Sequence, residues 1–378
     1  MKKILIVQHK ASTFGGIWSV NSSLAKKFKE LRYDVVLAAI RGEFSKKKSQ
    51  GINTHIINTQ DKWEVLTIKE CLKLLSNFKI RDFIKSIKDN KKRKHDIKKL
   101  SIFINDYQPD YIIASHYQVL DGIPACYYKK TYLHIHSSFS DAINHKATKK
   151  ELIKYNNKIG FIWLSNKAKE KAREFGLNNN ICIYNFVRFE TDKISDVIKN
   201  KKIVALTRLS KEKNLDIMIN MLEDVFNDSK YQNWTLEIYG EGSEEQKLKS
   251  LIHSKQIRIM PSVDNVEKIL LKSAINLNTS YNEGFCLSII EGYECGVPSI
   301  SFNFNEPTYE VVLDGKTGFV TKDQEDFKNK LTYLMDNSDI LKKLSFQAKT
   351  HSQKFYMDNI IKDWLTLFKK IDEGEKND

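Results

Sequence analysis

The chain opens with short apolar runs that are separated by a segment of helical spacing. Residues 3–7 (KILIV) are continuously apolar, residues 19–32 (SVNSSLAKKFKELR) space their apolar positions three and four apart, and residues 34–40 (DVVLAAI) are apolar again. Continuous apolar runs are typical of strands buried on both faces, whereas spacing of three to four is typical of amphipathic helices. The pattern predicts a strand–helix–strand unit.

The same kind of strand recurs along the first half of the chain. Further short apolar runs occupy residues 111–115 (YIIAS), 131–136 (TYLHIH) and 160–165 (GFIWLS), with helix-like segments among them. Buried strands that alternate with helices favour a parallel sheet covered on both faces.

Beyond residue 200 the pattern starts again. Strand-like runs lie at residues 202–209, 235–240, 256–260 and 274–280, and helices are predicted from about Leu215, Ser243 and Val266. Two similar α/β halves are therefore expected.

The boundary between the halves is expected between residues 185 and 202, where the charged stretch FVRFETDKISDVIKNKK lacks a strong period and suits a hinge. We predict a first domain over residues 1–190 and a second over residues 200–355. Residues 356–378 are expected to form a helix with a polar tail, with the helix packing back on the first domain.

An insertion in the first half has a different composition. Residues 66–100 carry apolar positions at roughly helical spacing, and residues 79–99 hold ten lysines and arginines against three aspartates. One or two basic amphipathic helices are predicted. Three interpretations stay open: contact with an anionic membrane surface, attraction of a polyanionic acceptor, and a solvated helix pair that packs on the first domain.

Composition narrows the class of protein. The net charge of +15 favours anionic partners such as lipid headgroups, phosphate polymers or nucleic acid, although lysine enrichment also occurs in proteins encoded by AT-rich genomes. No apolar run approaches the ~20 residues of a membrane span. The five cysteines are scattered and never spaced C-x-x-C, which predicts neither a disulfide framework nor a zinc site and favours the cytosol.

Two glutamates stand out in residues 282–301 (NEGFCLSIIEGYECGVPSIS). If a helix begins near Leu287, Glu283 lies at the mouth of the preceding loop and Glu291 one turn into the helix, so both could face one ligand. The backbone N–H groups of Phe285, Cys286 and Leu287 would then be free to bind an anion or a sugar hydroxyl. On geometry alone, the pattern favours the simpler alternative, a helix start with two solvated glutamates.

Two cations follow another predicted strand. Arg208 and Lys213 lie in LTRLSKEKNLD, between a strand and a helix, and together they suit a diphosphate. Ligands of open α/β sheets lie beyond the carboxyl ends of strands. The loops over residues 206–214 and 278–287 both follow predicted strands, so one site could use both.

These motifs resemble those of the family-4 retaining glycosyltransferases, of the kind that builds bacterial cell-surface glycans. The resemblance is carried by TRLSKEK, EIYGEGSEEQKL, the E-x7-E of EGFCLSIIE with GYECGVPSI behind it, and DGKTGFV. In the first half it involves Gly15 and Gly16 in TFGGI, the stretch HIHSSF, and YNFVRF at the domain junction. It implies the GT-B fold, in which two Rossmann-like α/β/α domains face a central cleft.

The resemblance also implies roles for individual residues. Arg208 and Lys213 would neutralise the diphosphate of a nucleotide sugar, and Glu291 would accept hydrogen bonds from the ribose. Glu283 would contact the transferred sugar, helped by the amides of Gly284, Phe285, Cys286 and Leu287. Gly15 and Gly16 would let the first loop approach the phosphate closely, and His136 would lie on the acceptor side of the cleft.

Some positions leave alternatives. His134 and His136 point to the same face of a strand, and either could simply be a satisfied core histidine. We prefer His136, and of Glu306 and Glu310 we align Glu310 with the family's usual glutamate. Asn185 is followed by Phe186 where the family commonly has glycine, so the turn at the junction is altered.

No metal or cofactor is expected. The chain contains no Asp-x-Asp, the carboxylate arrangement that hard divalent cations favour, and no G-x-G-x-x-G follows the first strand. We therefore expect a cytoplasmic enzyme, either free or peripheral at the inner face of the membrane. It would move a hexose or N-acetylhexosamine from a nucleoside diphosphate, UDP by preference, to a glycan, lipid-linked or phosphate-polymer acceptor. The alternatives are a nucleotide-sugar epimerase or phosphorylase of similar fold and a basic nucleic-acid-binding protein.

Overall fold

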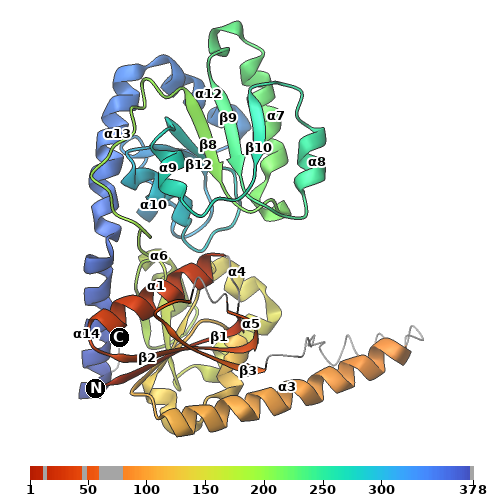
Figure 1. The fold of residues 1–378 in the computed structure, drawn as a ribbon, viewed down its shortest axis with the longest axis vertical. Coiled ribbons are helices and arrows are strands. Elements are labelled where there is room, and N and C mark those ends of the chain that lie inside the picture. Colours follow the sequence, from red (N-terminus) through yellow and green to blue (C-terminus); the bar gives the residue numbers. More distant parts are fainter. Residues whose placement is uncertain (12–14, 45–48, 59–79, 375–378) are drawn as a thin grey trace.

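The structure, a computed structural model, describes residues 1–11, 15–44, 49–58 and 80–374. Residues 66–79 of the predicted insertion and the polar tail over residues 375–378 lie outside this description. Two parallel sheets organise the chain, one in each half (Figure 1).

The first sheet has the order β3-β2-β1-β4-β5-β6-β7. Its strands are β1 (Lys3–Ala11), β2 (Asp34–Gly42), β3 (Asn53–Asn58), β4 (Tyr111–Ala114), β5 (Thr131–His134), β6 (Gly160–Trp163) and β7 (Asn180–Cys182). Its helices are α1 (Gly16–Glu30), α3 (Ile80–Tyr107), α4 (Phe139–Asn144), α5 (Lys146–Tyr155) and α6 (Asn166–Glu174). The strands at β3 and β7 were not predicted, because their short sequences lack a continuous apolar run.

Both faces of this sheet are buried, as the continuous apolar runs require. On β1, Leu5 and Val7 pack in one hydrophobic cluster, whereas Ile4 and Ile6 pack in another on the opposite face. Ile6 is in register with Leu37 of β2 and with Ile113 of β4. Alternate side chains of one strand therefore serve two separate apolar layers.

The second sheet has the order β10-β9-β8-β11-β12-β13. Its strands are β8 (Lys202–Leu206), β9 (Thr235–Tyr239), β10 (Ile257–Met260), β11 (Ile275–Asn278), β12 (Ser299–Phe302) and β13 (Gly318–Thr321). Its helices are α7 (Leu215–Phe226), α8 (Glu245–Ser250), α9 (Val266–Leu270), α10 (Leu287–Glu294), α11 (Thr308–Val311), α12 (Gln324–Asp336) and α13 (Ser338–Ser352). The predicted restart of the α/β pattern beyond residue 200 is confirmed, with β12 and β13 as additional strands.

The chain crosses between the domains twice. Residues 183–201 lead from β7 to β8, and near Phe355 the chain returns from α13 to α14 (Met357–Glu373). The two crossings meet where the Val187 N–H donates to the Phe355 carbonyl at 2.9 Å.

Helix α14 lies against the first domain although it follows the second in sequence (Figure 1). Trp364 and Phe368 belong to the same hydrophobic cluster as Ile4 and Ile6 of β1. The Phe368 ring stacks on Tyr111 with centroids 4.1 Å apart. Burial of these aromatic side chains ties the end of the chain to the first sheet.

Candidate active site at the domain junction

The carboxyl ends of the two sheets are brought together at the domain junction. A Cβ on Gly284, in the loop after β11, would lie 2.0 Å from the carbonyl oxygen of His136, which follows β5. A Cβ on Gly16, the first residue of α1, would lie 3.8 Å from Leu287 Cδ1 at the start of α10. Loops that were predicted separately in the two halves therefore face one another, and at position 284 only glycine fits.

Lys213 and Glu283 form an ion pair across two loops of the second domain. Lys213 lies in the short turn between β8 and α7, is only 8% exposed, and places Nζ 2.6 Å from Glu283 Oε1. The Ser280 hydroxyl donates to the same carboxylate oxygen at 2.8 Å. Because both charges are largely withdrawn from water, this pair is held in a defined geometry.

Arg208 occupies a different environment in the same loop. Its guanidinium is largely exposed and lies 3.3 Å from Glu212 Oε1. An exposed pair of this kind contributes little stability, so Arg208 is free to exchange its partner for a ligand.

Helix α10 begins at Leu287, as the sequence indicated. Cys286, just before it, adopts a left-handed backbone conformation with φ of 66°, and burial raises the pKa of its thiol to about 12. The Phe285 side chain packs in the core against Phe355. The backbone amides of this turn, rather than its side chains, are therefore the groups suited to a ligand.

Glu291 is 1% exposed and forms a bidentate ion pair with Arg188, whose Nη2 lies 2.7 Å from Oε2. Arg188 was not predicted as a site residue, although it lies in the stretch YNFVRF at the domain junction. Any hydroxyl that binds Glu291 would share the carboxylate with this guanidinium.

A group of histidines lies at the carboxyl end of the first sheet. The His134 and His136 ring centroids are 4.1 Å apart, and His9 of β1 stacks on His116 after β4 at 5.2 Å. Burial, followed by the neighbouring charge of His116, lowers the pKa of His136 to about 3. Burial likewise lowers the pKa of His9 to about 3 and that of His116 to about 4. These rings are neutral near pH 7 and suit hydroxyl groups better than anions.

Two carboxylates of the second domain hold the first domain directly. Glu310 accepts hydrogen bonds from the backbone N–H groups of Asn166 and Lys167 at 3.0 and 2.9 Å, at the start of α6. The Tyr184 hydroxyl donates to Glu310 at 2.5 Å.

Glu306 is also directed to the first domain, where Ser140 donates to it at 2.5 Å and Lys171 pairs with it at 2.9 Å. Both glutamates that the sequence offered for alignment with the family's usual glutamate therefore bind protein groups of the first domain in this structure.

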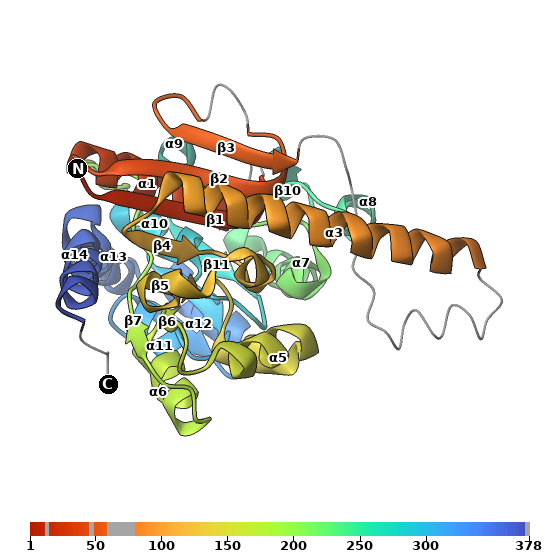
Figure 2. The same ribbon diagram turned by 90° about the horizontal axis from the view of Figure 1, so that it is seen from below.

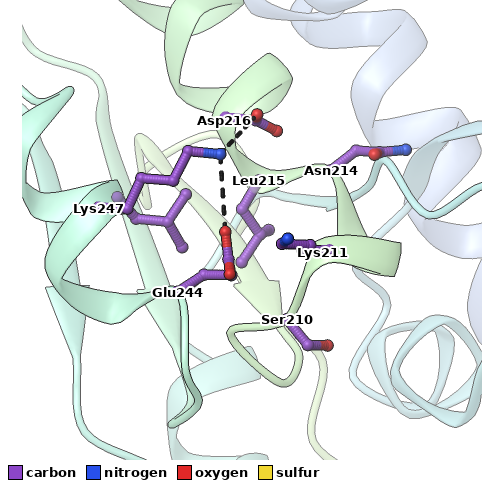
Figure 3. A pocket seen from close by; sticks show the side chains of 8 residues that line it. Ser210, Lys211, Asn214, Leu215, Asp216, Glu244 and Lys247 are labelled. Carbon is purple, nitrogen blue, oxygen red and sulfur yellow. Dashed lines mark hydrogen bonds and ion pairs between the residues drawn. The ribbon is translucent and has the colours of Figure 1, made fainter. Parts of the chain in front are cut away.

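A hollow of about 210 Å³ lies beside the Lys213 loop, on the side of α7 and α8 (Figure 3). Lys211 and Asn214 line it, and Lys247 within it pairs with Asp216 at 3.3 Å and with Glu244 at 3.6 Å. It contains none of the predicted site residues, and Asp216 and Glu244 already pair with Lys247.

The described residues contain neither a metal-ion cluster nor a membrane-spanning helix. No group of three or more His, Cys, Asp or Glu side chains there is arranged to hold a metal ion. Within the same residues, no helix combines the length and the apolar character needed to cross a bilayer.

Residues 188–351 match the model of the family described as glycosyl transferases group 1. The chain contains a group 1 glycosyltransferase domain. This domain includes the Lys213, Glu283 and Glu291 loops, and the match confirms the resemblance that their motifs carried.

Curated relatives match part of the chain. The poly(ribitol-phosphate) alpha-N-acetylglucosaminyltransferase of Staphylococcus aureus is 25% identical over 249 residues, 62% of this chain and 48% of that protein. The poly(glycerol-phosphate) alpha-glucosyltransferase of Bacillus subtilis is 26% identical over 178 residues, 46% of this chain and 26% of that protein. The chain spans about half the length of the first relative and about a quarter of that of the second.

Solved structures match over nearly the whole chain. TarM of S. aureus has a TM-score of 0.76 at 16% identity, covering 97% of this chain and 99% of that one. Anabaena HepE in complex with UDP-glucose has a TM-score of 0.74 at 16% identity, covering 98% and 100%. At this identity the likeness establishes the fold, and the predicted GT-B arrangement of two Rossmann-like domains is confirmed.

Proposed function

We propose that the chain is a retaining glycosyltransferase that moves a hexose or N-acetylhexosamine from a UDP-sugar to an acceptor in cell-surface glycan or teichoic acid synthesis. One observation carries this proposal. The loop of the Lys213–Glu283 pair and the start of α10 lie against His136 and Gly16 of the opposite domain. Two relatives named for transfer to polyol-phosphate polymers support the acceptor class. The UDP and UDP-glucose complexes of fold neighbours support the donor.

In this proposal the second domain holds the donor. Lys213 and Arg208 neutralise the diphosphate and stabilise the charge that develops on the departing UDP. The amides from Gly284 to Leu287 bind phosphate and sugar, while Gly15 and Gly16 allow the first domain to close on the diphosphate. Glu291 binds the ribose beside Arg188, and Glu283 binds a hydroxyl of the transferred sugar once the diphosphate attracts Lys213.

The first domain supplies the acceptor side. His136, neutral at pH 7, offers a nitrogen lone pair or an N–H to a hydroxyl without attracting the diphosphate. Because two cations already perform the electrostatic task that a divalent ion performs elsewhere, the proposed reaction needs no metal. The epimerase and nucleic-acid-binding alternatives are not favoured, since the matched family and the named relatives are glycosyltransferases.

The proposal is tested by release of nucleoside diphosphate from a panel of UDP- and GDP-sugars, with poly(glycerol phosphate), poly(ribitol phosphate) or no acceptor. We expect one UDP-sugar to be used in an acceptor-dependent manner, in EDTA as well as in added Mg²⁺. Proton NMR of the product should show the anomeric configuration of the donor. An inverted product would refute the retaining mechanism, and strict dependence on Mn²⁺ would refute the metal-free site.

A further inference from the structure

Helix α3 is anchored to the first domain through its second half. Asn58 of β3 donates to Asp96 at 3.0 Å, and Arg93 pairs with Asp121 at 2.7 Å. Leu100 and Ile104 are fully buried in the core cluster on that face of the sheet. From Arg93 onward the helix therefore has a fixed orientation.

One face of α3 points away from the domain along the whole helix. Near the start it carries Ile80, Ile84 and Ile87, which are 57%, 48% and 42% exposed. At steps of three and four residues, the same face continues with three exposed lysines, Lys91, Lys94 and Lys98. It ends with Ile102, which is 52% exposed. We call these seven residues the outward stripe.

The outward stripe combines apolar side chains with positive charge. Helix α3 as a whole contains nine lysines and arginines but only four aspartates. Large exposed apolar side chains gathered on one face mark an interaction site more often than isolated ones do. Lysines at the same face can extend their charged ends past a buried apolar stem, which fits an interface between an apolar and a charged layer.

The position of α3 relates the outward stripe to the candidate site. Because α3 joins the parallel strands β3 and β4, it begins on the side of the sheet where the strands end, the side of the domain junction. Figure 1 shows its first half extending past the body of the first domain, and Figure 2 shows it on the outside of the molecule.

We propose that the outward stripe of α3 docks the protein on an anionic lipid bilayer. The role of this docking, to bring the enzyme to a membrane-anchored acceptor, rests on the proposed function. The docking itself rests only on the residues of the outward stripe. Isoleucines enter the interfacial layer, and Lys91, Lys94 and Lys98 meet anionic headgroups. A soluble phosphate polymer would satisfy the lysines, but it offers no apolar layer for the four exposed isoleucines, and this favours the bilayer.

The test is co-sedimentation of the full chain with vesicles of phosphatidylcholine, with and without phosphatidylglycerol, over a salt series. One variant carries Ile80→Gln, Ile84→Gln and Ile87→Gln, because glutamine keeps helix propensity while removing the apolar surface. A second carries Lys91→Gln, Lys94→Gln and Lys98→Gln. Its matched control replaces three exposed lysines of the second domain, Lys255, Lys272 and Lys343, with glutamine. Arg93 is left in place because it anchors the helix to Asp121.

We expect the wild type to bind the anionic vesicles. The α3 lysine variant should bind about 100-fold more weakly, at about fivefold per lysine. The isoleucine variant should bind at least about tenfold more weakly. The second-domain control, with the same net charge as the lysine variant, should bind like the wild type.

Three results would overturn the proposal. The first is negligible binding of the wild type to anionic vesicles. The second is an isoleucine variant that binds as well as the wild type, which would reduce the stripe to a general cationic surface. The third is a loss of vesicle binding in the second-domain control that equals the loss in the α3 lysine variant.

Binding to soluble polyphosphate that is unaffected by the isoleucine changes, without vesicle binding, would identify a polyanion site instead. The assay contains no sugar donor, so it tests vesicle binding separately from the proposed transferase activity.

Discussion

The two edges that meet at the domain junction use different kinds of polar side chain. The edge of the second domain is built from ion pairs, Lys213 with Glu283 and Arg188 with Glu291. The edge of the first domain is built from half-buried imidazoles whose pKa values lie far below their ordinary value, among them His9, His116 and His136.

The difference indicates a division of labour. Ion pairs can exchange partners with a charged ligand at modest cost, because the ligand replaces one charge with another. Neutral imidazoles offer hydrogen bonds to hydroxyl groups without attracting a diphosphate to the wrong side. The charged edge therefore suits the donor and the neutral edge suits the acceptor.

The largest effect is expected from removal of the buried cation. Lys213→Ala should lower kcat/KM by about 100-fold or more, because a preorganised charge at the leaving group is lost. Lys211→Ala is the matched control: Lys211 is an exposed lysine of the same turn that lines the neighbouring hollow. Steady-state kinetics with the preferred donor would check both. Equal kcat/KM values in the two variants would contradict a special role for the buried Lys213.

Contact between the edges is tested by Gly284→Ala. The new Cβ would lie 2.0 Å from the His136 carbonyl, so the domains could not approach as they do here. We expect up to about 100-fold loss of kcat, because a small misplacement of reacting groups is costly. UDP binding should change little, since UDP is proposed to sit on the second domain. Small-angle scattering should show a less compact particle, and an unchanged profile with wild-type kcat would contradict the prediction.

A smaller effect is expected from Glu310→Ala. This change removes acceptors for two α6 amides and for the Tyr184 hydroxyl, at a cost of about 1–3 kcal/mol. A loss of about tenfold in kcat/KM should follow if Glu310 stabilises the closed arrangement. Glu170→Ala, on the exposed surface of the same helix, is the control. If Glu310 instead contacts the nucleotide, UDP affinity measured by calorimetry will fall in proportion.

The last prediction concerns the stability of the neutral edge at low pH rather than the rate of the reaction. The folded-state pKa values of His9 and His116, about 3 and about 4, lie below the ordinary value of 6.5. The unfolded chain therefore binds more protons below about pH 6.5, so these groups lower the free energy of unfolding as the pH falls from there towards pH 4. Each contributes about 1.4 kcal/mol per pH unit at most.

Urea unfolding at several pH values, for the wild type and for His9→Gln with His116→Gln, measures this contribution. The double variant should lose less stability between pH 6.5 and pH 4. Parallel curves for the two proteins would mean that the two imidazoles do not stay neutral in the folded protein.

Much of the fold was determined by local sequence. The continuous apolar run at β1 and the restart beyond residue 200 predicted two parallel α/β halves, because strands buried on both faces need apolar side chains at every position. The beginning of α10 at Leu287 was also predicted, since the loop residues before it interrupt the helical pattern. The sequence predicted one or two helices in the basic insertion, and among the described residues it forms a single helix from Ile80.

The tertiary structure decided which of these residues meet. Arg188 pairs with Glu291 across 103 positions, and Glu310 reaches the amides of α6 across 143 and 144. The contact between Gly284 and His136 exists only when two separately folded sheets are docked. Periodicity reports the environment along one element, whereas these contacts depend on how whole domains are oriented by the double crossing and by α14. For that reason the sequence by itself predicted residues at both edges of the candidate site, and only the docking of the domains determined how these edges face each other.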